Sequence, residues 1–179
     1  MTKFSVIVPT YNERRNIGIL YLLLRKAFEH PSLATDEFEI IVVDDNSPDG
    51  TQDVVKALQR EYGDARLLLR PRAGKLGLGT AYVHGLLHAS GEFVLIMDAD
   101  MSHHPKAIPE FIAKQREGDF DVVTGTRYVP GGGVHGKWEE RLCMWNPPLS
   151  LPSKFLRLRW LPPSPDMQNS STPHALPLH

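Results

Sequence analysis

Short runs of apolar residues alternate along the chain with stretches in which apolar positions recur every three to four residues. The short runs are rich in β-branched residues and end in turn-forming residues, which is typical of strands. Five strands are predicted, at residues 4–8, 38–45, 66–70, 93–97 and 120–126, the first ended by Pro9. The helical period predicts helices over residues 16–28, 54–62, 80–89 and 105–115. This alternation predicts an α/β fold, a mostly parallel sheet covered by helices.

The pattern stops after the glycine-rich stretch 131–136. Eight of the 15 prolines and all three tryptophans follow Gly136, and no glycine does. A proline-rich segment without a period of 2 or 3.6 builds neither helices nor central strands. We therefore predict one domain over residues 1–136 and a disordered tail over residues 137–179.

Composition excludes several classes of protein. The formal net charge of −1 and the pI of about 6.7 argue against a nucleic-acid binder, which usually carries a strong basic excess. Cys143 is the only cysteine, so an internal disulfide is impossible and a reducing compartment is favoured. The beginning of the chain lacks the apolar core of a signal peptide, and its longest apolar run, 17–24, is too short to span a membrane. We expect a chain that does not cross a membrane by itself.

Polar motifs follow four of the predicted strands. They are PTYNE at 9–13, DDNSPDG at 44–50, DADMSHH at 98–104 and GTRY at 125–128. Ligands of parallel α/β sheets bind at the carboxyl ends of the strands, so these motifs should meet at one edge.

Asp98 and Asp100 stand just past the fourth predicted strand, one residue apart. Two carboxylates so spaced can both reach one divalent cation, and Mg²⁺ or Mn²⁺ prefers oxygen ligands. Such a cation would neutralise a diphosphate. The alternative is that both residues only form a turn.

The other candidates each have a structural alternative. Asp45 is predicted to contact a nucleotide base or ribose, whereas Asp44 is predicted to form a turn. Tyr11 could stack on a base or be surface. GKLGLGTAY, residues 74–82, fits a loop near a diphosphate or a helix start, but neither a Walker A motif nor G-x-G-x-x-G.

Basic side chains and histidines complete the list. Arg127 could clamp a phosphate or make a surface ion pair. A basic run is interpreted as a solvated edge, and it comprises Arg66, Arg70, Arg72 and Lys75. The neighbours His103 and His104 have poor spacing for zinc, so helix-start or solvated roles are favoured.

Five motifs in this order carry a family resemblance. They are VIVPTYNE, IIVVDDNSPDGT, LRPRAGKLGLGTAYVHG, MDADMSHHP and GTRY. Between Lys3 and Gly136 the chain resembles the catalytic subunits of dolichol-phosphate mannosyltransferases, which are family 2 glycosyltransferases. The resemblance implies a GT-A (Rossmann-like) fold and the inverting transfer of mannose from GDP-mannose to dolichyl phosphate.

The resemblance also implies roles for individual residues. The guanosine part would be held by Pro9, Tyr11, Glu13, Val43 and Asp45. The diphosphate and a Mg²⁺ or Mn²⁺ cofactor would lie at Asp98, Ala99 and Asp100, with Ser102 close to the metal. Arg127 would meet a phosphate of donor or acceptor, and it is the second expected catalytic residue beside Asp100.

No general base is expected, because a phosphomonoester with a second pKa of about 6 is mostly a dianion at neutral pH. The family further implies small hydrophobic membrane subunits as partners and the cytosolic face of the endoplasmic reticulum as the location.

The resemblance ends at Gly136, where GKWEERLCMWNPP replaces the family's later elements. We therefore expect a truncated chain or one with an alternative C-terminus. Two other hypotheses remain: an inactive chain that binds a nucleotide sugar or partner subunits only, and a sugar-nucleotide pyrophosphorylase. The pyrophosphorylase is disfavoured because PTYNE stands where it would carry a glycine-rich loop.

Overall fold

The computed structural model describes residues 2–63 and 65–125. The chain divides into two compact units, Met1–Ile112 and Ala113–His179. The strands are β1 (Lys3–Thr10), β2 (Glu37–Asp44), β3 (Leu67–Pro71) and β4 (Phe93–Ile96). The α-helices are α1 (Ile17–Phe28), α2 (Thr51–Tyr62), α3 (Leu78–Leu86) and α4 (Ile108–Gly118). Two short 3-10 helices are η1 (Pro31–Leu33) and η2 (Pro105–Ala107).

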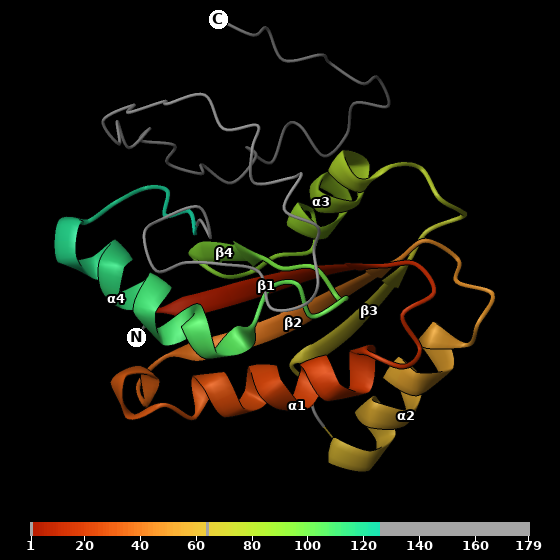
Figure 1. Ribbon diagram of the computed structural model, residues 1–179, viewed down its shortest axis with the longest axis horizontal. Helices are drawn as coiled ribbons and strands as arrows, with labels where there is room; N and C mark the ends of the chain where they lie inside the picture. The colour runs from red at the N-terminus through yellow and green to blue at the C-terminus, as the bar shows by residue number, and fades with distance from the viewer. Residues whose placement is uncertain (1, 64, 126–179) are drawn as a thin grey trace, which may run out of the picture. The chain divides into compact units, whose positions relative to one another are not determined.

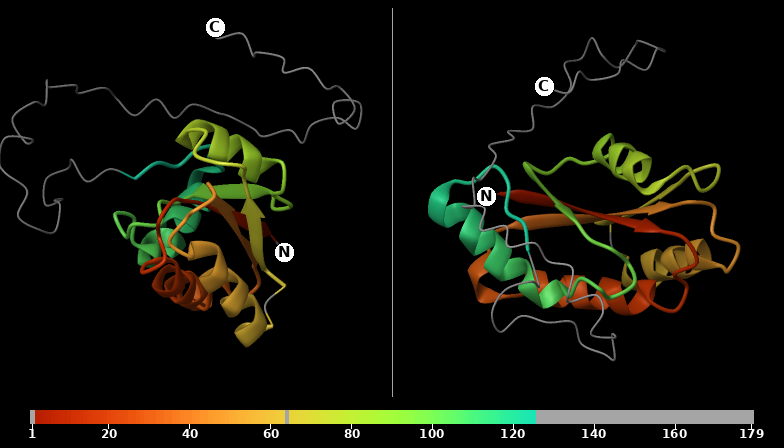
Figure 2. Two further views of the ribbon diagram at one scale, coloured as in Figure 1. Left: turned by 90° about the vertical axis from the view of Figure 1, so that its right-hand side faces the viewer. Right: turned by 45° about the horizontal axis from the view of Figure 1, so that its top comes forward.

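The four strands form one parallel sheet in the order β3-β2-β1-β4, which confirms the predicted parallel α/β fold (Figure 1). β1 and β2 pair over their full length, from Lys3 opposite Glu37 to Thr10 opposite Asp44. Helices α1 and α2 lie on one face of the sheet and α3 on the other (Figure 2). Both central strands are therefore covered on both faces, which explains why their sequences are continuously apolar.

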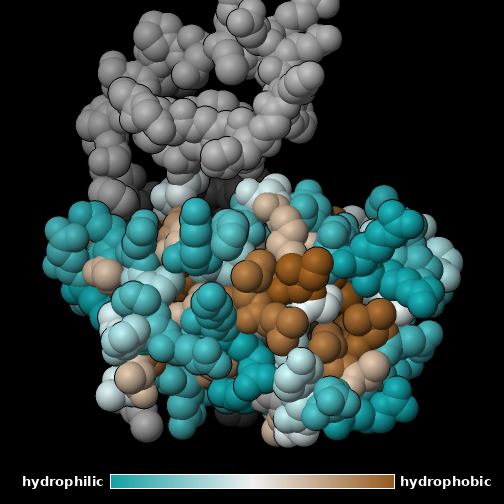
Figure 3. Space-filling view, turned by 60° about the horizontal axis from the view of Figure 1, so that its bottom comes forward, coloured by the Kyte–Doolittle hydropathy of each residue, from teal (hydrophilic) through white to brown (hydrophobic). Residues whose placement is uncertain are grey.

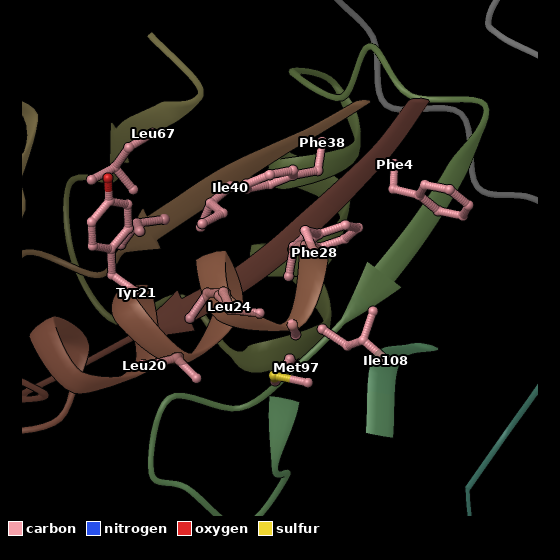
Figure 4. Close-up of a cluster of buried hydrophobic side chains, with 14 of the residues drawn as sticks. Phe4, Leu20, Tyr21, Leu24, Phe28, Phe38, Ile40, Leu67, Met97 and Ile108 are labelled. Atoms are coloured by element: carbon pink, nitrogen blue, oxygen red, sulfur yellow. The ribbon is translucent and has the colours of Figure 1, made fainter. Parts of the chain in front are cut away.

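The core follows the alternation of side chains along the strands. Val6, Val8, Ile40 and Val42 point to the α1 side, where they pack with residues of α1 such as Leu20 and Leu24. The residues between them form a second, smaller cluster on the α3 side, made of Ile7, Ile41, Val43 and Ala81. Aromatic rings fill one end of the larger cluster (Figure 4), where Phe28 and Phe38 stack with ring centroids 4.3 Å apart.

β1 does not stop before Pro9 as predicted but continues to Thr10. The carbonyl of Ile7 accepts from the Met97 N–H, so odd-numbered residues of β1 direct their backbone groups toward β4. β4 ends at Ile96, level with Ile7. Proline has no backbone N–H to donate. At Pro9 this costs no hydrogen bond between strands, because β4 has already ended on the side to which that N–H would point.

Two helix starts differ from the prediction. α3 begins at Leu78, two residues before the predicted start at Thr80. Thr80 thus lies in the first turn, where its hydroxyl donates to Leu76 O at 2.9 Å or Gly77 O at 2.8 Å. Pro105 opens a 3-10 turn capped by His104, and the α-helix begins only at Ile108.

The fifth predicted strand is wrong for residues 120–125, which form no strand. The backbone of Phe120 is instead used to close the end of α4. Its N–H donates to Gln115 O at 3.0 Å, and its carbonyl accepts from Gln115 Nε2 at 3.3 Å. Thr126 and the tail predicted at 137–179 lie outside the described residues.

A buried carboxylate ties the strands together at their amino ends. Glu39 of β2 is 6% exposed and accepts from the Ser5 hydroxyl at 2.6 Å. It also accepts from the Ser90 N–H at 2.6 Å and the Ser90 hydroxyl at 2.8 Å, and Lys3 Nζ lies 3.4 Å away. Burial raises the pKa of Glu39, but the hydrogen bonds from Ser5 and Ser90 and the charge of Lys3 outweigh it, so the net pKa is lowered.

This network predicts a loss of stability in acid. A carboxyl group whose folded pKa is lowered stabilises the fold above its unfolded pKa, about 4.3, and loses that contribution as the pH falls through the folded pKa. Glu39→Gln should lower the free energy of unfolding at neutral pH by about 2 kcal/mol. Its stability should then fall less steeply below about pH 4.3 than that of the unmodified chain.

Urea unfolding over a pH series measures both quantities. Glu37→Gln is the matched control, because Glu37 is an exposed residue of the same strand. Parallel acid profiles for Glu39→Gln and the unmodified chain would contradict the assignment.

Candidate functional site

Four loops leave the sheet at the carboxyl ends of its strands and meet at one edge. They follow β1, β2, β3 and β4, as the parallel registers require. The backbone N–H of Asn12 donates to the Ser47 hydroxyl at 3.0 Å, which joins the first two loops directly. The convergence predicted for PTYNE, DDNSPDG and DADMSHH is thus confirmed, whereas Arg127 of GTRY lies outside the described residues.

Three of these loops contain a residue with left-handed backbone that is not glycine. Asn12, Asn46 and Met101 have φ angles of 62°, 56° and 66° and follow β1, β2 and β4. This conformation costs about 1–2 kcal/mol for most side chains, and asparagine tolerates it best. Met101 offsets the cost in part by packing against the core. Each turn is therefore held by its surroundings in one shape, as a binding edge requires.

Asp44 is the hub of the β1 and β2 loops and has no exposed surface. Its Oδ1 accepts from the hydroxyls of Thr10 at 2.8 Å and Ser47 at 2.6 Å. Its Oδ2 accepts from the Ser47 N–H at 2.9 Å and Gln52 Nε2 at 2.7 Å. The predicted structural role of Asp44 in the turn is confirmed.

Asp45 lies beside it and makes a bidentate ion pair with Arg72. Arg72 Nε donates to Asp45 Oδ1 at 2.6 Å, and Nη2 donates to Oδ2 at 2.7 Å. Arg72 Nη1 also donates to the Thr80 hydroxyl at 2.6 Å. The arginine therefore connects the end of β2 to the start of α3.

The prediction that Arg72 belongs to a solvated edge is wrong, because its side chain is only 5% exposed. Its position explains the pairing. Pro71 of β3 is in register with Asp44 of β2, so the next residues, Arg72 and Asp45, are neighbours.

The other residues predicted to bind the nucleoside differ in their exposure to solvent. Tyr11 is 40% exposed, and Lys75 Nζ stands 4.6 Å from the centre of its ring. Glu13 is half-buried, and its carboxylate accepts from Asn16 Nδ2 at 2.8 Å. Pro9 is half-buried in β1, and its register partner Val43 is fully buried under α3. The edge thus exposes Tyr11 and covers Val43.

Asp98 stands two residues after β4 and is contacted from two elements. His103 Nδ1 accepts from the Asp98 N–H at 3.2 Å and lies 3.7 Å from Asp98 Oδ2. Tyr82 of α3 reaches the same carboxylate. Burial, the charge of Asp98 and a hydrogen bond with Asp98 together raise the pKa of Tyr82. Tyr82 was not foreseen at this position, because only the packing of α3 brings it there.

Asp100 follows the buried Ala99 and is exposed. Its Oδ1 accepts from the Ser102 N–H at 2.9 Å. Hydrogen bonds from the Ser102 hydroxyl and N–H, helped by His103, lower the pKa of Asp100 against a smaller opposing effect of burial. The residue thus forms a turn and also presents an ionised carboxylate at the surface.

The expected cofactor fits these donors. Asp98 and Asp100 offer carboxylate oxygens, and the Asp98 side chain is 38% exposed. In the described part of the chain no group of three or more potential metal ligands gathers. Mg²⁺ needs only one or two carboxylates when substrate phosphates supply further ligands. Ser102 orients Asp100 through its hydrogen bonds, and its place near a metal stays a prediction.

The two neighbouring histidines have separate roles. His104 Nδ1 accepts from the Lys106 N–H at 3.2 Å and caps η2, which confirms the helix-start role. His103 turns to Asp98. They therefore do not present a shared pair of nitrogens.

The sequence of this chain matches a known protein family. Residues 5–170 match the family described as glycosyl transferase family 2. The chain belongs to that family. Family membership and the parallel sheet together confirm the GT-A-like fold that the resemblance implied.

Two curated relatives of this glycosyltransferase are named dolichol-phosphate mannosyltransferase. The protein from Pyrococcus furiosus is 39% identical over 132 residues, which cover 74% of this chain and 35% of that protein. The protein from Saccharomyces cerevisiae is 36% identical over 136 residues, which cover 76% and 49%. The chain therefore spans about a third to a half of the length of these relatives.

This chain is also similar to a solved structure. A mannosyltransferase from Pyrobaculum calidifontis, in complex with GDP-Man and Mn²⁺, matches with a TM-score of 0.60 and 28% identity. The match covers 70% of this chain and 36% of that one.

Proposed function

We propose that this chain transfers mannose from GDP-mannose to dolichyl phosphate with inversion, giving dolichyl β-D-mannosyl phosphate for protein glycosylation. One observation carries the proposal. Asp98 and Asp100 flank a buried alanine at the carboxyl end of β4, on the edge where three other loops converge. The names of the relatives and the GDP-Man in the Pyrobaculum calidifontis complex support this choice of donor and acceptor.

The donor would lie across the carboxyl ends of β1, β2 and β4. Tyr11 is exposed there and can cover one face of a base, while Glu13 and Asp45 offer carboxylates close to the ribose and base. Pro9 would lie in the floor under the guanosine, and Val43, which is buried under α3, would support that floor from below. Binding of the base would require Asp45 to share or exchange its contact with Arg72.

A Mg²⁺ or Mn²⁺ ion held by Asp98 and Asp100, with Ser102 beside them, would supply positive charge to the departing diphosphate. The protein itself orients these carboxylates. Ser102 fixes Asp100, and Tyr82 and His103 fix Asp98. The orientation is set before the donor arrives, which is what electrostatic stabilisation of a leaving group requires.

The acceptor needs positioning rather than a base. A phosphate monoester is already mostly ionised at neutral pH, so the site must align it with the sugar carbon. Asp100 and Arg127 are the proposed catalytic residues, and Arg127 would meet a phosphate of donor or acceptor.

We also propose small hydrophobic membrane subunits as partners and the cytosolic face of the endoplasmic reticulum as the location. The support is indirect: a dolichyl acceptor is a membrane lipid. Among the described residues, no helix is long and apolar enough to span a bilayer.

The second candidate is a chain that binds nucleotide sugar or partner subunits without transfer. It is favoured by one observation: the described residues of the edge, among them Tyr11, Asp98 and Asp100, are those proposed for the donor, whereas Arg127 lies outside the described residues. The two candidates share the donor site and differ only in turnover.

A transfer assay with radiolabelled GDP-mannose and detergent-solubilised dolichyl phosphate separates them. We expect a labelled lipid product that requires Mg²⁺ or Mn²⁺ and disappears on chelation. GDP-mannose binding is measured in the same preparation. Metal-dependent donor binding with no product would support the second candidate, and absence of both would refute the proposed function.

A further inference from the structure

Arg72 is a buried arginine at the edge where the four loops converge. Its side chain is only 5% exposed, so a ligand bound at this edge can hardly reach the guanidinium group itself. The backbone N–H of Arg72 donates to Asp44 O at 2.7 Å, which fixes the start of its loop beside the end of β2. Arg72 must therefore act on a ligand through the residues that it holds.

The guanidinium group of Arg72 is held from two sides. On one side Nη1 donates to the Thr80 hydroxyl at 2.6 Å and Nη2 to Gly77 O at 3.2 Å, both at the start of α3. On the other side Nε and Nη2 donate to the two oxygens of Asp45, at 2.6 Å and 2.7 Å. A guanidinium group is planar and rigid, so these contacts fix the plane of the Asp45 carboxylate.

The Asp45 carboxylate keeps the capacity to accept from a ligand. An ionised carboxylate has about four lone-pair positions, and the bidentate pair with Arg72 uses about two of them. The Asp45 backbone is also fixed, because its N–H donates to Thr10 O at 3.0 Å. The carboxylate is 10% exposed. A ligand therefore meets a small acceptor surface that is held in one orientation.

Such an acceptor distinguishes the two purine bases. The hydrogen-bonding edge of guanine carries two adjacent donors, N1–H and the 2-amino group, whereas adenine carries an acceptor nitrogen, N1, in the corresponding place. An ionised carboxylate accepts and cannot donate, so it attracts the guanine edge and repels the adenine edge. A carboxylate that is free to rotate can turn away from adenine, so it discriminates less between the two bases.

We propose that Arg72 is a positioning residue that makes the candidate site prefer guanine to adenine, because it holds Asp45 as a fixed acceptor for the edge of the base. Arg72 itself does not touch the base. The inference rests on the proposed function in one respect, the contact between Asp45 and the base of the donor. An ion pair that serves only the fold is the competing explanation, and it predicts equal losses of affinity for all nucleotides.

The experiment is calorimetry of GDP and ADP binding to the full chain in the presence of Mn²⁺. The two nucleotides share the ribose and the diphosphate, so the ratio of their affinities reports the base alone. Arg72→Lys keeps the charge beside Asp45 but has no planar fork to orient the carboxylate. It should weaken GDP binding by about tenfold and leave ADP binding nearly unchanged, so the preference for GDP falls by about tenfold.

Arg70→Lys is the matched control, because Arg70 is a half-buried arginine of β3 that donates to Leu69 O at 3.0 Å and has no contact with Asp45 among the described interactions. It should leave both affinities unchanged.

A double variant tests whether Arg72 acts through Asp45. Asp45→Asn keeps the size of the side chain but adds a donor group, so it should lower the preference for GDP by itself. Adding Arg72→Lys to Asp45→Asn should then change the ratio of the two affinities by less than about twofold.

A variant far from the site separates positioning from a general loss of stability. Figure 3 views the molecule from the side on which α1 lies and shows apolar residues gathered there. Leu24 of α1 has no exposed surface, and Leu24→Ala should lower the unfolding temperature by about 10 °C. The preference for GDP should remain unchanged in this variant below its unfolding temperature.

Four results would overturn the proposal. They are an unchanged preference for GDP in Arg72→Lys, an equal loss of GDP and ADP affinity in that variant, a further fall of the ratio when Arg72→Lys is added to Asp45→Asn, and a fall of the ratio in Leu24→Ala.

Failure of the proposed function is separable from failure of this inference. Selective GDP binding that depends on Arg72, without mannose transfer by the unmodified chain, would refute only the transfer. Mannose transfer together with an unchanged preference for GDP in Arg72→Lys would refute only the role of Arg72. Absence of GDP binding by the unmodified chain would refute both.

Discussion

Replacement of Asp100 by Asn is expected to weaken metal-dependent GDP-mannose binding by about 100-fold. Asn keeps the size of the side chain and can still accept from Ser102, so the turn should remain. It removes the negative charge that a Mg²⁺ or Mn²⁺ ion requires from its ligand. Asp98→Asn should act in the same direction, and the hydrogen bond from its backbone N–H to His103 should remain.

Calorimetry with and without metal measures the effect. Asp53→Asn is the control, because Asp53 is an exposed carboxylate in the first turn of α2 that pairs with Lys56 and is not among the residues proposed to bind donor or metal. The variants should lose binding only in the presence of metal, and their metal-free affinities should match that of the unmodified chain. Equal metal-dependent affinity in Asp98→Asn, Asp100→Asn and the unmodified chain would show that the pair is not a metal site.

The second large effect is expected from Asp44→Ala, which should lower the free energy of unfolding by about 3 kcal/mol. Asp44 is fully buried and accepts four hydrogen bonds from Thr10, Ser47 and Gln52. Alanine leaves all four donors without this acceptor, and the Thr10 hydroxyl among them is buried, whereas Ser47 and Gln52 are half-buried. Denaturant unfolding measures the loss.

Asp53→Ala provides the comparison, since its carboxylate is 84% exposed and should cost less than about 1 kcal/mol. Hydrogen exchange should also accelerate in the loops after β1 and β2, because Asp44 holds both. A stability of Asp44→Ala within error of the Asp53 control would contradict the view of Asp44 as a structural hub.

The sequence predicted the strands of the sheet well because their signal is local. FEIIVVDD is apolar at successive positions only because β2 is covered on both faces, and the same holds for β1. The convergence of the loops was also predictable, since it follows from parallel pairing alone. Asp44 and His104 were assigned correctly because turns and caps depend on neighbours in sequence.

The order of the strands within the sheet could not be predicted from the sequence. Arg72 was misjudged because its partner Asp45 lies on another strand, and only the order β3-β2-β1-β4 makes the two neighbours. Tyr82 was missed for a similar reason: its contact with Asp98 depends on how α3 packs. The segment 120–125 has the composition of a strand, but a strand also needs a neighbouring strand to pair with. The backbone N–H and carbonyl of Phe120 instead form hydrogen bonds with Gln115 at the end of α4.

The position of β1 in the middle of the sheet has a consequence for synthesis on the ribosome. β1 is made first, yet Phe4 pairs with Phe93, 93 − 4 = 89 positions later. At a rate of 5–20 residues per second, roughly 4 to 18 seconds pass before β4 can join it. During that time β1, β2 and β3 can form a three-stranded sheet whose open edge is the apolar strand β1. An open apolar edge is a template for pairing with other chains. The nascent chain is therefore exposed to pairing at the edge of β1 until Ile96 has emerged, and faster synthesis or a lower concentration of nascent chains should limit such pairing.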